Sequence, residues 1–252
     1  MSTNIEYRHK VKIFPLEKSV DEFVATEVIS QLNLKLNSVI SIATGNSTKN
    51  VQQILVNEYQ KGKVDFSNVV FFGLDEYWSI KPNHPISTAK RMREQFFDQV
   101  NFQQGNIYFP NGTAKDLEGE LDRWRKIFYS YGNLDLAVLG IGPGKTCHLG
   151  LNNPPSSSDS KIRYVEINPE SRQAMVEKLS LSADEIPEGG ITLGMTEILA
   201  AKSIILIAKG KDKAWGIFRS LKGKIGPDAP ASFLRYHPEV IVVLDKEASA
   251  KL

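Results

Sequence analysis

The chain has 252 residues, of which 41% are apolar and 24% are charged, and its formal net charge is +2. This is the balance of an ordinary globular protein with a full apolar core, and the length fits one large α/β domain over residues 1–252. Because the net charge is small and the basic residues are scattered, nothing indicates a nucleic-acid partner or an acidic membrane surface.

Cysteine usage and the N-terminal segment indicate the compartment. The single cysteine, Cys147, has no partner for a disulfide within the chain, so an oxidising compartment has no support. The N-terminal segment is polar, and no apolar run approaches the roughly 20 residues that span a bilayer. We therefore expect a cytoplasmic protein with no membrane partner.

Short apolar runs alternate with longer amphipathic segments along the chain. The apolar runs predict strands over residues 38–42, 69–74, 134–141, 203–208 and 240–244. The periodic segments predict helices over residues 49–60, 88–100, 117–129 and 214–221. Buried strands separated by helices indicate an α/β fold, a three-layer αβα sandwich around a mainly parallel sheet.

Four of the expected strands end in short polar segments, TGNST, DEYW, GPGKTCH and KGKDK. Ligands of such sheets bind beyond the carboxyl ends of the strands, so we expect the four segments to line one cleft. The first segment contains Thr44, Gly45, Asn46, Ser47 and Thr48 and precedes a helix. Backbone amides at a helix N-terminus favour an anion. The same residue types also cap helices, and the two interpretations are compatible.

Charged residues in two of these segments suggest chemistry. Asp75 and Glu76 follow an apolar strand, where burial can tune a carboxylate into a proton-transfer base. An acid in a surface turn is the commoner case. Lys213 closes the fourth segment and is either a solvated charge or an ammonium group that pairs with a phosphate.

The glycine-rich segment from Gly140 to Thr146 resembles a P-loop. The first glycine of that motif would fall on Leu139, however, and no long helical pattern follows, so we reject a nucleotide triphosphatase. A lone histidine such as His148 is more often structural than catalytic, and Cys147 beside it would point to the opposite face of an extended chain. Neither residue has the spacing of metal ligands, so we expect no metal and no cofactor.

Seven segments follow one another along nearly the whole chain: ATGNST, LDEYW, MREQFFDQV, LDLAVLGIG, HLGLNNP, GGITLGMTEIL and APASFLRYHPEVIVVLD. In order and spacing they resemble the glucosamine-6-phosphate deaminase/isomerase family, including its galactosamine-6-phosphate branch, which is related to the 6-phosphogluconolactonases. The resemblance implies a single domain with a modified Rossmann-like fold. It also implies a hydrolase and isomerase that opens the ring of an amino-sugar 6-phosphate, moves a proton between C1 and C2, and releases ammonia to give a ketose 6-phosphate.

The resemblance also implies roles for individual residues. The proton-shuttling aspartate falls on Asp75 and the ring-opening histidine on His148. The phosphate loop falls on residues 45–48 and the phosphate lysine on Lys213. Arg172 lies near the position of a second basic phosphate ligand. Thr44, Glu76 and Asn153 complete the residues expected at the substrate. The expected partner is a small-molecule sugar phosphate, without nucleic acid, and a homo-oligomer is left open.

The residues around His148 depart from the family pattern. Two carboxylates that would orient and charge-stabilise His148 are replaced by Thr146 and Asn153, and Pro143 and Gly144 lengthen the segment. A neutral Asn does not stabilise an imidazolium as a carboxylate does. A catalytically weak or inactive, regulatory sugar-phosphate-binding protein is therefore the alternative to a deaminase-like enzyme. A 6-phosphogluconolactonase is less favoured, because that branch has Asp-Glu-Arg where this chain has Asp-Glu-Tyr.

Overall fold

The computed structural model describes residues 10–142, 144–167, 172–173, 175–177 and 181–252. Within them, a seven-stranded sheet has the order β1-β10-β9-β6-β2-β3-β5, and every neighbouring pair is parallel. The strands are β1 (Lys10–Phe14), β2 (Val39–Ile42), β3 (Val70–Phe72), β5 (Ile107–Tyr108), β6 (Leu136–Gly140), β9 (Ser203–Ala208) and β10 (Val240–Asp245). The expected α/β fold with a parallel sheet is confirmed.

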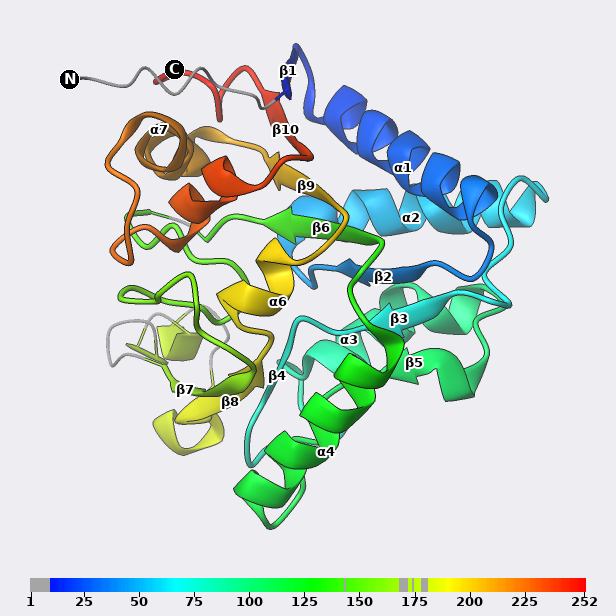
Figure 1. Ribbon diagram of the computed structural model, residues 1–252, viewed down its shortest axis with the longest axis vertical. Helices are drawn as coiled ribbons and strands as arrows, with labels where there is room; N and C mark the ends of the chain where they lie inside the picture. The colour runs from blue at the N-terminus through cyan, green and yellow to red at the C-terminus, as the bar shows by residue number, and fades with distance from the viewer. Residues whose placement is uncertain (1–9, 143, 168–171, 174, 178–180) are drawn as a thin grey trace.

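Helices cover both faces of this sheet (Figure 1). One face carries α1 (Glu17–Leu34), α2 (Asn46–Gln60) and α3 (Thr88–Gln95), and the other carries α4 (Leu117–Tyr131), α6 (Met195–Leu199) and α7 (Ala214–Lys222). Short 3-10 helices are η1 (Phe97–Gln99), η2 (Gln104–Asn106), η3 (Ala183–Glu185), η4 (Lys211–Lys213) and η5 (Pro230–Tyr236). None of the described helices combines the length and the apolar character needed to cross a bilayer.

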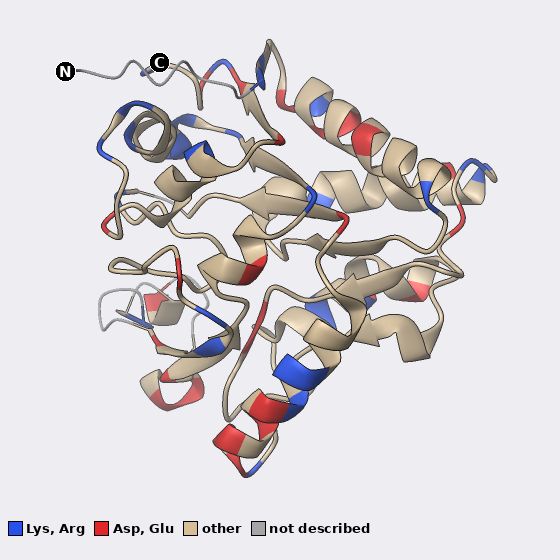
Figure 2. Ribbon diagram, viewed as in Figure 1, with Lys and Arg blue, Asp and Glu red and all other residues tan. Residues whose placement is uncertain are grey.

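The core is divided into two apolar clusters, one on each face of the sheet. Because side chains alternate along a strand, Ala137 and Leu139 of β6 join the cluster with α4 and α7, whereas Leu136 and Val138 join the cluster with α1 and α2. Charged residues lie along the outer helices α1 and α4, whereas the strands β2, β6 and β9 contain none (Figure 2). Continuous apolar runs are therefore the sequence signature of these doubly covered strands.

A second, smaller sheet was not expected from the sequence. It contains β4 (Asp75–Tyr77), β8 (Gly189–Thr192) and β7 (Arg163–Glu166), in the order β4-β8-β7 with antiparallel pairing. The expected strand over residues 69–74 is interrupted after Phe72, and Leu74 accepts a hydrogen bond from the amide of Leu193 at 2.7 Å. Asp75 therefore begins a strand of the second sheet instead of lying in a turn.

Two expected helices have different bounds in the structure. The helix expected over residues 88–100 ends at Gln95, because the buried Phe96 takes a non-helical φ of −142°. Its ring packs edge-on against Phe66, with 5.2 Å between the ring centroids. The helix expected from residue 49 begins at Asn46, so the last three residues of the TGNST segment form its first turn.

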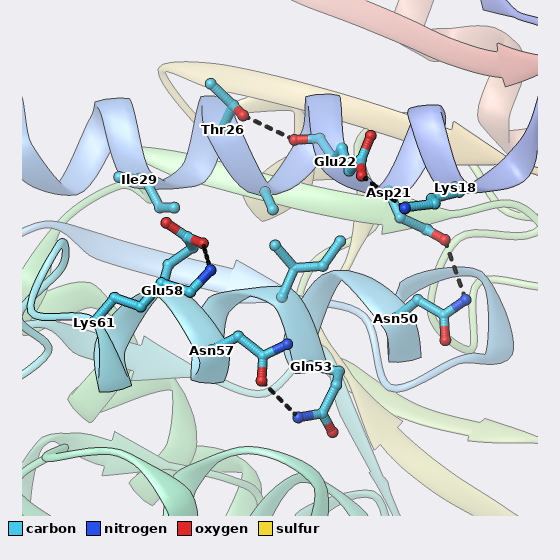
Figure 3. Close-up of a pocket in the computed structure, with 12 residues that line it drawn as sticks. Lys18, Asp21, Glu22, Thr26, Ile29, Asn50, Gln53, Asn57, Glu58 and Lys61 are labelled. Atoms are coloured by element: carbon cyan, nitrogen blue, oxygen red, sulfur yellow. Dashed lines mark hydrogen bonds and ion pairs between the residues drawn. The ribbon is translucent and has the colours of Figure 1, made fainter.

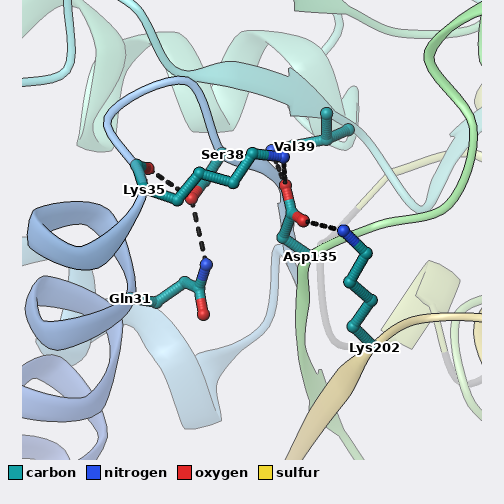
Figure 4. A network of polar contacts seen from close by, with 6 residues as sticks. All are labelled: Gln31, Lys35, Ser38, Val39, Asp135 and Lys202. Carbon is teal, nitrogen blue, oxygen red and sulfur yellow. Dashed lines mark hydrogen bonds and ion pairs between the residues drawn. The ribbon is translucent and has the colours of Figure 1, made fainter.

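A carboxylate holds the amino edge of the large sheet together (Figure 4). Asp135, just before β6, accepts hydrogen bonds from Lys35 Nζ at 2.6 Å, Lys202 Nζ at 2.8 Å and the amide of Val39 at 2.8 Å. Burial acts to raise the pKa of Asp135, but the bonds from Lys202 and Lys35 outweigh burial and lower it. This network joins the starts of β2, β6 and β9.

Candidate functional site

Three loops meet at the opposite, carboxyl edge of the large sheet. The strand order places β6 between β2 and β9. The segments that follow these strands are the β2 loop (residues 43–48), the β6 loop (residues 141–150) and the β9 loop (residues 209–213). Because parallel strands all end at the same edge, the three loops are neighbours, as the sequence predicts.

Direct contacts join the three loops. A Cβ atom at Gly140 would lie 3.7 Å from the Cβ of Ser47, so the end of β6 packs on the first turn of α2. The amide of Gly144 donates to the carbonyl of Asp212 at 3.4 Å and connects the β6 and β9 loops. Pro143, the other inserted residue of the β6 loop, lies outside the described residues.

The β2 loop leaves backbone amides available at the start of α2. Thr48 is buried, and its hydroxyl donates to the carbonyl of Ala43 at 2.5 Å, so this side chain shapes the loop. Nothing lies within 4 Å of the Cβ position at Gly45, which precedes the helix. The amide of Gly45 donates to Thr48 Oγ1 at 3.4 Å. The half-buried Thr44 and the amides of Asn46 and Ser47 therefore border an open N-terminus, an arrangement that favours an anion.

Asp75 lies where β4 begins, half-buried and paired in register with Thr192 of β8. Burial, and then the charge of Glu76, raises the pKa of Asp75 to about 7, against an opposing effect of Arg91. A Cβ at Gly150 would lie 3.2 Å from Asp75 Oδ2 and 3.1 Å from Thr192 Oγ1. The β6 loop thus passes directly over the Asp75 carboxyl group, and a glycine permits that approach.

Glu76 has a role in holding α3. Its buried carboxylate accepts hydrogen bonds from Ser87 Oγ at 2.7 Å and from the amides of Thr88 at 3.1 Å and Ala89 at 3.0 Å. Thr88 Oγ1 also donates to the backbone carbonyl of Asp75 at 2.5 Å. The first turn of α3 is therefore fixed to β4, and Glu76 stabilises its free amides as a helix cap does.

Arg91 is a residue of this site that the sequence analysis missed. It lies three residues after Thr88 on α3, and residues at that spacing share a helix face. Helical side chains lean toward the N-terminus, here toward β4. Burial and the charge of Glu76 raise the pKa of Asp75, and the positive charge of Arg91 acts against them. The spacing from the start of α3 is the signal that could have found Arg91.

His148 is held between a hydroxyl and a glycine. Its Nδ1 lies 2.7 Å from Thr146 Oγ1. A Cβ at Gly142 would lie 2.1–2.5 Å from three atoms of the imidazole ring, so the ring packs directly on that backbone. Burial, and then the charge of Lys213, lowers the pKa of His148 to about 4. Lys213, whose side chain is 13% exposed, also lies 3.5 Å from the carboxylate of Asp212.

The second half of the β6 loop is fixed by Asn152, which the sequence analysis did not single out. Its buried side-chain amide donates to the carbonyls of Leu149 at 2.9 Å and Leu193 at 2.8 Å. Its Oδ1 accepts a hydrogen bond from Arg163 Nη1 of β7 at 2.8 Å. The second sheet therefore supports both Asp75 and the loop that carries His148.

Two residues expected at the substrate have other surroundings. Arg172 Nη2 donates to the carbonyl of Ile186 at 2.9 Å, which ties Arg172 to the segment before β8. Within the described ranges, no hydrogen bond joins the Asn153 side chain to His148, whose Nδ1 partner is Thr146. The structure thus brings together the β2 loop, Asp75, His148 and Lys213, while it places no contact of Arg172 among them.

A groove of about 640 Å³ lies elsewhere, between α1 and α2 (Figure 3). Its polar lining includes Asp21, which accepts hydrogen bonds from Asn50 at 3.1 Å and from Lys209 Nζ at 2.6 Å. None of the residues that line the groove belongs to the three loops. Across the described residues, no group of three or more His, Cys, Asp or Glu side chains could hold a metal ion.

Known proteins similar to this chain share its fold over nearly its full length. A family model described as glucosamine-6-phosphate isomerases/6-phosphogluconolactonase matches residues 15–242. The chain is 37% identical over 227 residues to the glucosamine-6-phosphate deaminase of Thermoanaerobacter pseudethanolicus. The aligned residues cover 90% of this chain and 88% of that relative. It is 37% identical over 235 residues to the protein of the same name from Halothermothrix orenii, with 93% and 96% covered.

Solved structures also superpose on this chain over nearly its full length. A monomeric glucosamine-6-phosphate deaminase superposes with a TM-score of 0.91 at 31% identity, over 96% of this chain and 100% of the other. The 6-phosphogluconolactonase of Trypanosoma brucei superposes with a TM-score of 0.75 at 16% identity, over 98% of this chain and 100% of the other. The second likeness shows the fold alone.

Proposed function

The chain belongs to the family of glucosamine-6-phosphate isomerases and 6-phosphogluconolactonases, and we propose that it is a single-domain deaminase of an amino-sugar 6-phosphate. The observation that carries this proposal is Asp75, a half-buried carboxyl group at the carboxyl edge of the sheet with a pKa raised to about 7. A base with this pKa is ionised in part at neutral pH and retains the basicity that proton abstraction requires. Relatives named as deaminases support the choice of reaction.

The phosphate binds at the β2 loop in this proposal. The amides at the start of α2 and the positive end of the helix dipole attract the dianion. Lys213 supplies a full positive charge from the neighbouring β9 loop. Because the phosphate is held there, the sugar carbons extend toward the β6 loop and Asp75.

His148 opens the pyranose ring. The O1 hydroxyl gives its proton to the neutral imidazole, C1 and O1 form a carbonyl, and the C1–O5 bond breaks. The electron pair of that bond goes to O5, which receives the proton from the imidazolium. The support is that burial and Lys213 lower the pKa of His148 to about 4, so the ring is neutral near pH 7.

Asp75 moves the proton between the two carbons. The carboxylate takes the proton from C2, the double bond forms between C1 and C2, and O1 takes a proton from the C2 ammonium group, which gives an enolamine with a hydroxyl on C1 and an amine on C2. The Asp75 carboxyl group, whose proton exchanges with solvent while the enolamine is bound, then protonates C1 and leaves a C2 iminium group. Water then adds to C2 and ammonia leaves, which gives the ketose 6-phosphate and consumes one water. In this scheme the charge of Arg91 tunes the basicity of Asp75.

A regulatory sugar-phosphate-binding protein of weak or absent activity is the second candidate. It is favoured by the neutral Thr146 and Asn153, which replace both carboxylates that the family places around the histidine. The lactonases carry no comparable support, because their likeness to this chain is limited to the fold.

The test is Asp75→Asn, assayed for ammonia release and ketose 6-phosphate formation with several hexosamine 6-phosphates. Loss of a positioned base should lower kcat by about 10²–10⁴-fold. Binding of the sugar phosphate should persist, because the phosphate is held by other residues. Turnover that survives the substitution would remove Asp75 from the role of base. Wild-type protein that binds hexosamine 6-phosphates without turnover, even when they are supplied ring-opened, would favour the second candidate.

A further inference from the structure

The β6 loop replaces a charged partner of the catalytic histidine with a neutral one, and the geometry of that replacement is specific. Thr146 Oγ1 lies 2.7 Å from His148 Nδ1, a normal hydrogen-bond distance. Cys147, between them, is buried and takes a φ of +48°, a left-handed conformation that is uncommon for a residue other than glycine. The loop is thus shaped so that the hydroxyl meets the ring.

The hydrogen bond is compatible with two tautomers of a neutral imidazole. If Nδ1 carries the proton, it donates to Thr146 and Nε2 has a free lone pair. If Nε2 carries the proton, the hydroxyl donates to Nδ1 and the ring has no base on its other nitrogen. Among the described residues, the partner of the ring at Nδ1 is Thr146.

We propose that Thr146 is the positioning residue of His148, and that its hydroxyl accepts the Nδ1 proton so that the Nε2 lone pair is the base for ring opening. This inference rests on the proposed function for the identity of the proton that Nε2 removes, which is the O1 proton of a cyclic sugar phosphate. The Nδ1 proton stays in place throughout. The transferred proton arrives at Nε2 from O1 and leaves it to O5.

The charges around the ring fit a neutral dyad. Lys213 of η4 acts on His148 with a positive charge, and the carboxyl group of Asp75 lies beside Gly150. A hydroxyl oxygen can accept the Nδ1–H bond without adding a carboxylate close to the phosphate-binding loops. The ring itself is fixed by its packing on Gly142, so Thr146 has to set only the tautomer.

The first test is ¹⁵N NMR of the histidines in the ligand-free protein, comparing wild type with Thr146→Val and Thr146→Ser. Of the four histidines, His148 is assigned with His148→Gln. We expect a protonated Nδ1 and an unprotonated Nε2 in wild type and in Thr146→Ser, and a mixture of tautomers in Thr146→Val. A protonated Nε2 as the major wild-type form, or identical spectra for wild type and Thr146→Val, would overturn the proposal.

The second test is kinetic and uses the same variants. Thr146→Val should lower kcat on cyclic hexosamine 6-phosphate about tenfold, the scale of one neutral hydrogen bond, with little change in KM. Thr146→Ser should restore kcat to within about twofold, because it retains the hydroxyl. A Thr146→Val enzyme as fast as wild type on the cyclic substrate would contradict the assignment.

The two tests separate failure of this inference from failure of the proposed function. The NMR spectra report the tautomer whether or not any sugar phosphate turns over. An inactive wild type with Nδ1 protonated through Thr146 would leave the positioning role intact and reject the deaminase. Thr146→Asp provides an independent check, because a carboxylate at this distance should raise the pH midpoint of the His148 titration by about one to three pH units. An unchanged midpoint would mean that residue 146 does not contact the ring.

Discussion

Asp75 and Asp135 lie at opposite edges of the same fold and have opposite surroundings. Asp135, at the amino edge, accepts hydrogen bonds from two lysines and an amide, and the lysines overcome burial and lower its pKa. Asp75, beside the carboxyl edge, has a pKa raised to about 7 by burial and by Glu76. No described residue donates a hydrogen bond to its carboxylate.

One fold therefore uses the same side chain in two ways. A carboxylate surrounded by donors is stabilised as an anion and holds strands together. A carboxylate deprived of donors is destabilised as an anion and is poised to take a proton. The second arrangement reduces stability, a common property of functional sites.

The largest effect on stability is expected for Asp75→Asn. A raised pKa means that the folded state binds the proton more tightly, so stability falls as the pH rises from about 4 to about 7. Removing the ionisable group should raise the free energy of unfolding at pH 8 by up to about 4 kcal/mol and leave it unchanged at pH 3. Chemical denaturation at both pH values measures this. A variant no more stable than wild type at pH 8 would show that the ionised Asp75 carboxylate does not destabilise the fold.

Asp135→Asn should have the opposite sign. Its lowered pKa stabilises the fold above about pH 4, and this contribution is lost as the pH falls through the folded pKa. Loss of the charged hydrogen bonds should cost about 1.5–3 kcal/mol at pH 7. The melting temperature should fall, while kcat at 20 °C stays at the wild-type value. Lost activity in a fully folded Asp135→Asn protein would show that the two edges are not independent.

The sequence predicted much of the carboxyl edge and little of what supports it. The apolar runs of β6 and β9 define the parallel sheet, and the rule for ligand sites in such sheets then brings the β2, β6 and β9 loops together. The strand β4 has only three residues, too few for a periodic pattern, and its partner β8 is more than 100 residues away in the chain. The early end of α3 depends on tertiary packing of Phe96, which no local pattern contains.

The contacts that act on His148 and Asp75 could not be predicted from the sequence either. The hydrogen bond between Thr146 and His148 depends on the left-handed backbone at Cys147, a conformation that is uncommon for a residue other than glycine. The influence of Arg91 on Asp75 requires knowing that Glu76 and Thr88 fix α3 to β4. The sequence placed Asp75 directly after an apolar run, whereas its place at the start of β4 and its surroundings required the structure.

Lys213→Met tests the phosphate side of the carboxyl edge. Loss of one charged hydrogen bond should weaken binding of a hexosamine 6-phosphate by about 1.5–3 kcal/mol, or roughly 10- to 150-fold in Kd. Because the charge of Lys213 also lowers the pKa of His148 after burial does, the His148 titration should move upward. Calorimetry and NMR measure the two effects. Lys202→Met, at the amino edge, is the matched control and should leave both unchanged. Equal affinities for wild type and Lys213→Met would remove Lys213 from the site.

The smallest effect is expected for Arg91→Gln. Burial and Glu76 raise the pKa of Asp75 and Arg91 acts to lower it, so its removal should raise that pKa further. In the proposed mechanism the ionised carboxylate is the base, so the acid limb of the pH profile of kcat should move to higher pH, and kcat at pH 9 should approach that of wild type. Arg93→Gln, on another face of the same helix, is the control. An acid limb that stays in place would show that Arg91 does not act on Asp75.

Hydrogen exchange at the substrate carbons reports directly on the proposed role of Asp75. Wild type and Asp75→Asn are incubated with hexosamine 6-phosphate in D₂O, and deuterium at C1 and C2 is followed by NMR. If Asp75 moves the proton between these carbons, wild type incorporates solvent deuterium in the product and the recovered substrate, whereas Asp75→Asn incorporates none although it still binds the sugar phosphate. Incorporation by Asp75→Asn at the wild-type rate would contradict the assignment of Asp75 as the base.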